Sequence, residues 1–160
     1  MTIAVGDHIP DVKVSVPTAE GNKPAQTAEL LGKGRVVLFA VPGAFTPTCS
    51  DFHLPGYVLR ADDLKAKGVD TVACLSVNDA FVMGAWGAAQ EVGDAVVMVA
   101  DGSGAWTKAV GLEVDLTAGG LGVRSKRYAV ILDDGVVTDL AVEDGLGLEV
   151  SAVETVLEKL

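Results

Sequence analysis

The chain contains two cysteines, Cys49 and Cys74, and these side chains have the greatest scope for covalent chemistry. A cysteine reacts as its thiolate, so its reactivity depends on whether the surroundings favour the anion. Two cysteines at this spacing predict neither a disulfide scaffold nor a zinc site. A thioredoxin-type dithiol is excluded because no Cys-x-x-Cys occurs. What remains to be decided is whether one of the two thiols is reactive.

Cys49 lies where a buried strand is expected to give way to a helix. Residues 35–41 form a short apolar run that a Pro-Gly pair ends, and Thr46 with Pro47 is typical of a helix N-cap and first position. The unpaired N–H groups and the positive dipole end of a first helical turn favour an anion. An isolated cysteine is more commonly a small buried hydrophobe, however, and position alone leaves both interpretations open.

The segment around Cys49 resembles the peroxidatic-cysteine motif of the peroxiredoxins, Pro-x-x-x-Thr-x-x-Cys. Pro42, Thr46 and Cys49 fill this motif, and its continuation His-Leu-Pro-Gly-Tyr is similar to the atypical type II, or five, subfamily. Further stretches match the same subfamily: residues 5–10, 72–81, 84–87 and 124–128. The likeness therefore covers most of the chain.

The resemblance implies roles for particular side chains. Cys49 would be the peroxidatic cysteine and Thr46 would place its hydroxyl on the peroxide. Pro42 would shield the thiolate from water and wrong substrates, and Arg127 would hold both thiolate and peroxide. Arg124 is a second candidate for the arginine; Arg127 is favoured because it directly precedes an expected strand. Neither a metal nor a cofactor is implied.

A lowered thiol pKa alone would explain little of a fast peroxide reaction. An ordinary thiol of pKa ~8.5 is roughly 3% ionised at neutral pH, and a pKa of ~6 gives about thirtyfold more thiolate. The nucleophilicity of a thiolate falls as its pKa falls, with a Brønsted slope of ~0.4–0.5, and this loss cancels about tenfold of the gain in thiolate. Alignment of the O–O bond and stabilisation of the leaving oxygen must therefore supply most of the rate.

The activity implied is thiol-dependent reduction of hydrogen peroxide and alkyl hydroperoxides through a sulfenic acid at Cys49. Some members of the subfamily form an internal disulfide with a second cysteine, in a segment resembling residues 147–151, where this chain has Val150. We therefore expect an external thiol to recycle the enzyme. Glutathione, glutaredoxin and thioredoxin all remain open. A homodimer is expected as well.

Two other functions stay open at this point. A peroxide-sensing thiol switch would be oxidised by the same chemistry and would relay the oxidation to a partner. A cysteine acyl-transfer enzyme would need a base, and His53 lies four residues after Cys49 on the same helical face. The resemblance gives His53 no such role, and a structural histidine is the favoured interpretation. Cys74, within an expected strand, is interpreted as a core residue.

The elements expected along the chain alternate between strand and helix before ending in a hairpin and a last helix. Expected strands cover residues 35–41, 69–77, 95–100, 127–132 and 136–142; expected helices cover 47–65 with a kink at Pro55, 79–91 capped by Asn78, a short segment ending near 110, and a last helix opened by a capping box of Ser151 and Glu154. Residues 111–125 are predicted to be an irregular loop. This order predicts one α/β domain over residues 1–160, with a mixed central sheet and helices on both faces, and it is the element order of the thioredoxin-like fold. The resemblance to the peroxiredoxins implies that family's N-terminal and loop additions to this fold.

Composition excludes several classes of partner. The net charge of −10 offers no basic surface for phosphate neutralisation, so nucleic acid is not an expected ligand. Hydrophobic residues make up 49% of the chain, as in a globular protein, but no apolar run approaches the ~20 residues of a membrane span. The first residues lack the basic start and apolar core of a signal peptide. The expected location is therefore cytoplasmic.

Overall fold

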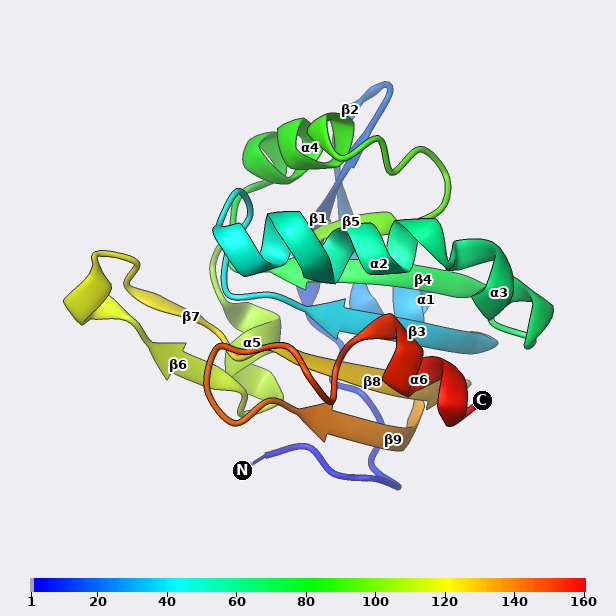
Figure 1. Ribbon diagram of the computed structural model, residues 1–160. Coiled ribbons are helices and arrows are strands. Elements are labelled where there is room, and N and C mark those ends of the chain that lie inside the picture. Colours follow the sequence, from blue (N-terminus) through cyan, green and yellow to red (C-terminus); the bar gives the residue numbers. More distant parts are fainter. Residues whose placement is uncertain (1) are drawn as a thin grey trace.

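A mixed sheet with strand order β2-β1-β5-β4-β3-β8-β9 forms the centre of the computed structural model, which describes residues 2–160 (Figure 1). Its strands are β1 (Lys13–Thr18), β2 (Gly21–Gln26), β3 (Arg35–Ala40), β4 (Thr71–Ser76), β5 (Val97–Ala100), β8 (Tyr128–Asp133) and β9 (Val136–Val142). The three strands β3, β4 and β5 are parallel, whereas the other pairings are antiparallel. The expected thioredoxin-like sheet is confirmed.

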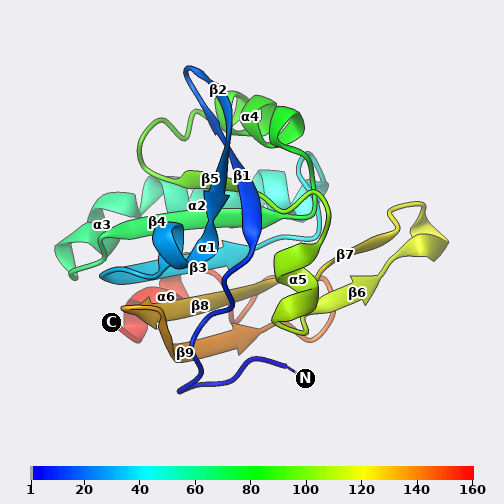
Figure 2. The same ribbon diagram turned by 180° about the vertical axis from the view of Figure 1, so that it is seen from behind.

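Helices cover both faces of this sheet. One face carries α2 (Leu54–Leu59), α3 (Ala61–Ala66), α4 (Ala80–Ala89) and α6 (Val153–Glu158); the other carries α1 (Thr27–Leu31) and α5 (Ala105–Ala109) (Figures 1 and 2). On β3, Val37 and Phe39 join the first core layer while Val36 and Leu38 join the second. Successive side chains of a strand point to opposite faces, so a strand covered on both sides is apolar throughout.

The long helix predicted over residues 47–65 is present but not continuous. Helical structure begins at Pro47, passes through a π-helical turn, η1 (Cys49–His53), and continues as α2 and α3. The N–H of Leu54 donates to the carbonyl of Cys49, five residues earlier. Pro55 has no N–H with which to continue the ladder, so the expected kink takes the form of a wide turn immediately before it.

Two predicted helix caps are wrong. The carboxylate of Asp79, not Asn78, caps α4 by accepting a hydrogen bond from the N–H of Val82 at 2.8 Å. The capping box of Ser151 and Glu154 does not form, because α6 begins after Ala152 without a side-chain cap. Asn78 and Ser151 instead make contacts with distant segments of the chain, around Cys49 and His53. The apolar stripe predicted for the last helix is confirmed, since Val153, Val156 and Leu157 are buried.

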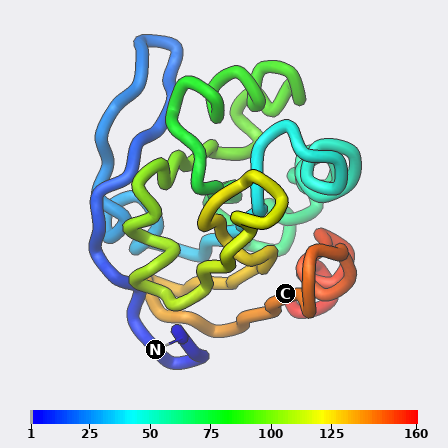
Figure 3. Tube along the Cα trace, turned by 90° about the vertical axis from the view of Figure 1, so that its left-hand side faces the viewer, coloured from blue at the N-terminus to red at the C-terminus, as the bar shows by residue number. Residues whose placement is uncertain are grey.

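The segment predicted as an irregular loop contains a small hairpin. Within residues 111–125, β6 (Glu113–Asp115) pairs antiparallel with β7 (Val123–Ser125), and a 3-10 turn, η2 (Thr117–Gly119), lies between them. The hairpin projects at the left of Figure 1 and faces the viewer in Figure 3. Strands of three residues with mixed polarity are too short to give a recognisable period in the sequence, which explains the wrong prediction.

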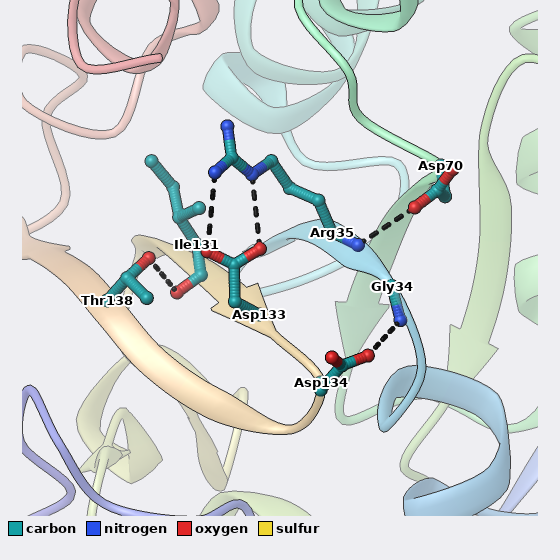
Figure 4. Close-up of polar contacts among 7 residues, drawn as sticks. All are labelled: Gly34, Arg35, Asp70, Ile131, Asp133, Asp134 and Thr138. Carbon is teal, nitrogen blue, oxygen red and sulfur yellow. Dashed lines mark hydrogen bonds and ion pairs between the residues drawn. The ribbon is translucent and has the colours of Figure 1, made fainter.

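Arg35 joins three strands at the end of the sheet opposite the Cys49 loop (Figure 4). Its Nε and Nη2 donate to the carboxylate of Asp133 at 3.1 and 3.3 Å, and its backbone N–H donates to Asp70 at 2.9 Å. The hydrogen bond to Asp133 and its charge raise the pKa of Arg35. These partly exposed contacts align the strand ends and contribute modestly to stability.

None of the helices within residues 2–160 is both long enough and apolar enough to span a membrane.

Candidate active site

Cys49 lies in the first turns of the helical segment, beyond the carboxyl end of β3. Its side chain has no exposed surface, and it packs in the same core layer as Phe39 and Tyr57. The first N–H groups of a helix lack intrahelical acceptors and favour an anion nearby. The predicted placement of Cys49 at a helix N-terminus is confirmed. Its complete burial was not predicted.

Arg127 immediately precedes β8, and its side chain extends to Cys49. Its Nη2 donates to Cys49 Sγ at 3.1 Å, its Nη1 lies 2.9 Å from Nδ1 of His53, and its Nε donates to the carbonyl of Leu146 at 3.3 Å. Arg127 is buried, and among residues 2–160 no carboxylate forms an ion pair with it. A buried cation requires a compensating partner, and this geometry places the sulfur of Cys49 against the guanidinium.

Arg124, the alternative arginine, does not contact Cys49. From β7 it donates through Nη1 to the carbonyl of Pro42 at 3.2 Å and through Nε to the carbonyl of Leu121 at 2.8 Å. Gly43 makes room for it, because a Cβ at that position would lie 2.7 Å from Nη1 of Arg124. Arg124 therefore ties the β6–β7 hairpin to the loop before Cys49.

The hydroxyl of Thr46 forms a hydrogen bond to a residue earlier in the same loop. It donates to the carbonyl of Gly43 at 2.6 Å. A hydroxyl has one proton, and its remaining capacity is to accept a hydrogen bond. Thr46 is half-buried and Pro42 is buried in the same loop.

Asn78 supports the loop from the neighbouring strand, a role that the sequence prediction missed. Its Oδ1 accepts from the backbone N–H of Ala44 at 3.0 Å and from the hydroxyl of Ser76 at 2.6 Å. Trp86 holds the helical side, donating from its indole to the hydroxyl of Ser50 at 3.0 Å. A polar residue just after a buried parallel strand was the available signal, since such residues meet at one edge of the sheet.

His53 is buried and its ring is neutral. Nε2 lies 3.1 Å from the carbonyl oxygen of Ser151, which can only accept, so Nε2 carries the proton and Nδ1 accepts from Arg127. Burial, and then the charge of Arg127, lowers the pKa of His53 to about 3. Both ring nitrogens are engaged, which leaves neither free to take a proton from Cys49. The geometry thus favours a structural His53 over an acyl-transfer base.

Cys74 shares a core layer with Cys49 but sits in the middle of β4 without exposed surface. Burial, followed by the nearby Cys49, raises the pKa of Cys74 well above its usual range. It is therefore a neutral thiol, and both cysteines are free. This agrees with the interpretation of Cys74 as a core residue.

The buried His53 predicts that stability depends on pH. Its pKa is lowered from 6.5 to about 3 on folding, so between these values the unfolded state binds more protons. The stabilisation is complete above about pH 6.5 and is lost as the pH falls. We expect the free energy of unfolding to drop by about 2 kcal/mol between neutral pH and about pH 5. Denaturant titrations at several pH values measure this.

The control for this pH dependence uses the second histidine of the chain, His8, which is exposed. The variant His53→Asn should flatten the pH dependence between neutral pH and about pH 5, whatever its own stability, because its side chain does not titrate. The variant His8→Asn should retain the dependence of the wild type. An unchanged slope in His53→Asn would contradict the assignment to His53.

A thioredoxin-like sheet with a buried cysteine at a helix N-terminus, beside a buried arginine, defines a class of thiol-based redox proteins. In agreement, residues 4–157 match the family described as Redoxin. The chain is 50% identical over 161 residues to Peroxiredoxin-2B of Arabidopsis thaliana, covering 99% of this chain and 98% of that protein. The chain belongs to the peroxiredoxin family.

Two further similarities bear on the function. The chain is 52% identical over 164 residues to the chloroplastic Peroxiredoxin-2E-2 of Oryza sativa subsp. japonica, covering 99% of this chain and 73% of that protein. It is also 55% identical to reduced Prx3 of Vibrio vulnificus, whose crystal structure is a complex with hydrogen peroxide. That comparison covers 99% of both chains with a TM-score of 0.94. The thioredoxin-like peroxiredoxin fold is thus established.

Proposed function

We propose that this chain, as one domain over residues 1–160, is a thiol peroxidase that reduces hydrogen peroxide and alkyl hydroperoxides at Cys49. The observation that carries the proposal is the 3.1 Å contact between Arg127 Nη2 and Cys49 Sγ in a site closed to bulk water. The complex of the Vibrio vulnificus relative with hydrogen peroxide supports it.

The reaction proceeds as a displacement on oxygen. The thiolate of Cys49 attacks one oxygen of the peroxide; the S–O bond forms, the O–O bond breaks, and the leaving oxygen departs as water or an alcohol after protonation. Arg127 donates hydrogen bonds to the sulfur and to the developing negative charge. The hydroxyl of Thr46, its own proton engaged by Gly43, accepts from the peroxide O–H and orients the O–O bond. Pro42 keeps water away from the sulfur.

The choice between the cysteines tests this mechanism. We expect Cys49→Ser to abolish peroxide consumption, because its hydroxyl stays protonated at neutral pH. Cys74→Ala should retain most of the activity; alanine is preferred over serine there because a buried hydroxyl would lack a partner. Peroxide consumption with a thiol reductant measures both variants. Equal losses would instead indicate a mechanism that uses both sulfurs.

Arg127→Ala should slow the oxidation of Cys49 far more than it changes the fraction of thiolate. Removal of one preorganised donor to developing charge costs about 100-fold or more, whereas altered thiol ionisation changes the net rate only a few-fold. Rapid-mixing kinetics give the oxidation rate, and the ultraviolet absorbance of the thiolate gives its fraction. Arg124→Ala is the matched control and should have a much smaller effect. A loss of rate that is fully explained by a smaller fraction of thiolate would contradict the role proposed for Arg127.

An external thiol returns the sulfenic acid to the thiol in this proposal. The position at which some relatives would place a resolving cysteine is Val150, which is 39% exposed, and Cys74 lies inside the sheet. Glutathione with glutaredoxin, and thioredoxin, are the candidate donors. Peroxide consumption with each donor system separates them. Rapid turnover with either also argues against the alternative of a peroxide-sensing switch, which need not cycle quickly.

Oxidation without added thiol should leave a single-cysteine product. We expect one equivalent of peroxide to add one oxygen to the intact mass, and excess peroxide to add a second as sulfinic acid, with loss of activity. The sulfenic acid persists because Cys74 can approach Cys49 only if the intervening structure opens, which costs free energy. Intact-mass spectrometry decides: a loss of two hydrogens would reveal an internal disulfide.

We also propose a subfamily and an oligomeric state for this protein, and a cytoplasmic location. The motif continuing through residues 53–57, and relatives named Peroxiredoxin-2, support the atypical type II subfamily. A homodimer is supported by exposed apolar side chains, among them Phe45, Phe81 and Val123. Sedimentation analysis tests this. The cytoplasmic location stays a prediction, since a relative is chloroplastic, and cell fractionation decides it.

A further inference from the structure

We propose that Glu143 is a positioning residue for Arg127: its carboxylate holds the loop of residues 144–152 in the conformation that fixes the guanidinium against Cys49. This inference rests on the proposed peroxidase function and adds a residue to it that lies outside the motif around Cys49.

The 144–152 loop supplies most of the support of the guanidinium. The carbonyl of Leu146 accepts directly from Nε of Arg127 at 3.3 Å. The carbonyl of Ser151 lies 3.1 Å from Nε2 of His53, whose Nδ1 accepts from Arg127 at 2.9 Å. Two of the three contacts of the guanidinium therefore depend on this one loop, and the third is the contact with Cys49 itself.

The loop has little packing of its own to hold it in place. It lies between β9 and α6 without helical or strand structure, and the side chains of Leu146 and Val150 are exposed. Loops of this kind open more readily than the elements beside them. The buried hydroxyl of Tyr57 donates to the carbonyl of Ser151 at 2.7 Å, but the remaining part of the loop needs a polar restraint of its own to keep the carbonyl of Leu146 aimed at the site.

The carboxylate of Glu143 provides this restraint. Its Oε2 accepts three hydrogen bonds from the far side of the loop: from the N–H of Glu149 at 2.9 Å, the N–H of Ser151 at 2.8 Å and the hydroxyl of Ser151 at 2.6 Å. Hydrogen bonds to a charged acceptor are stronger than neutral ones. The backbone N–H of Glu143 donates to the carbonyl of Arg127 at 2.9 Å, so the restraint begins beside the arginine.

The ionised state that this restraint needs is favoured. Burial by itself raises the pKa of Glu143, but the hydrogen bonds from the side chain of Ser151 and from backbone amides outweigh it and lower the pKa overall. The groups facing the carboxylate are donors, and within residues 2–160 it forms no ion pair. Its charge therefore serves to hold the backbone.

Loss of the restraint should act on the peroxide reaction in particular. A guanidinium released from Leu146 and His53 can rotate away from the line of the O–O bond, and small misplacements of a catalytic donor are costly. Alkylation of the thiolate needs no such donor to a leaving oxygen. A purely structural role for Glu143 would instead lower both reactions together, or would affect stability alone.

The experiment compares Glu143→Ala and Glu143→Gln with Asp144→Asn, which removes the same charge from the exposed neighbouring residue. Rapid mixing measures oxidation of Cys49 by hydrogen peroxide, and iodoacetamide measures its alkylation. We expect Glu143→Ala to slow oxidation about tenfold while alkylation changes only a few-fold. Glu143→Gln, which keeps an acceptor oxygen, should lie between it and the wild type. Asp144→Asn should match the wild type.

A double-mutant cycle makes the test specific to the arginine. If Glu143 acts through Arg127, Glu143→Ala should cause no further loss of the peroxide rate in an Arg127→Ala background. Additive losses, or equal losses of oxidation and alkylation, would overturn the inference. Should Glu143→Ala not fold, as judged by thermal unfolding, Glu143→Gln carries the same cycle. A wild type that reduces no peroxide would refute the proposed function, whereas a normal peroxide rate in Glu143→Ala refutes only the inference.

Discussion

The contact between the guanidinium of Arg127 and the sulfur of Cys49 is the interaction around which the site is built. Both groups are buried, and a cation removed from water must have a partner to offset the cost of desolvation. Among the described residues no carboxylate forms an ion pair with this arginine, so its field acts on the sulfur. The guanidinium and the sulfur thus lie in direct contact in buried surroundings, where electrostatic interactions are strong.

The elements around this pair each hold one part of it. The loop after β3 delivers Cys49, and Asn78 and Arg124 fasten that loop to β4 and to the β6–β7 hairpin. The start of β8 delivers Arg127, while Leu146 and His53 fix its side chain. The sheet, anchored at its other end by Arg35 and its carboxylate partners, provides a rigid base for both segments. Preorganisation of this kind avoids the cost of reorienting donors during the reaction.

The sequence predicted the central strands, the helix start at Pro47 and the position of Cys49 because each depends on local pattern: apolar runs, proline and turn residues. Contacts between distant segments were beyond it. Asn78 and Ser151 both look like helix caps locally, yet the side chain of Asn78 accepts from the N–H of Ala44, and the hydroxyl of Ser151 donates to Glu143. Local chemistry is the same for a cap and for a long-range contact, and only tertiary packing decides between them.

The burial of Cys49 suits the proposed attack on peroxide but constrains the proposed regeneration by an external thiol. A sulfur without exposed surface cannot be contacted by an external thiol until the structure around it moves. The segment that would have to move is η1, where the helical ladder is already widened by the five-residue step from Leu54 to Cys49. Two contacts oppose such opening: the hydrogen bond from the indole of Trp86 to the hydroxyl of Ser50, and the contact of Cys49 Sγ with Arg127. In the proposed mechanism, attack on the O–O bond turns a thiolate into a neutral sulfenic acid, which would weaken the contact between Sγ and Arg127. The contact that orders the site for the proposed first step would therefore be reduced when the proposed second step requires access.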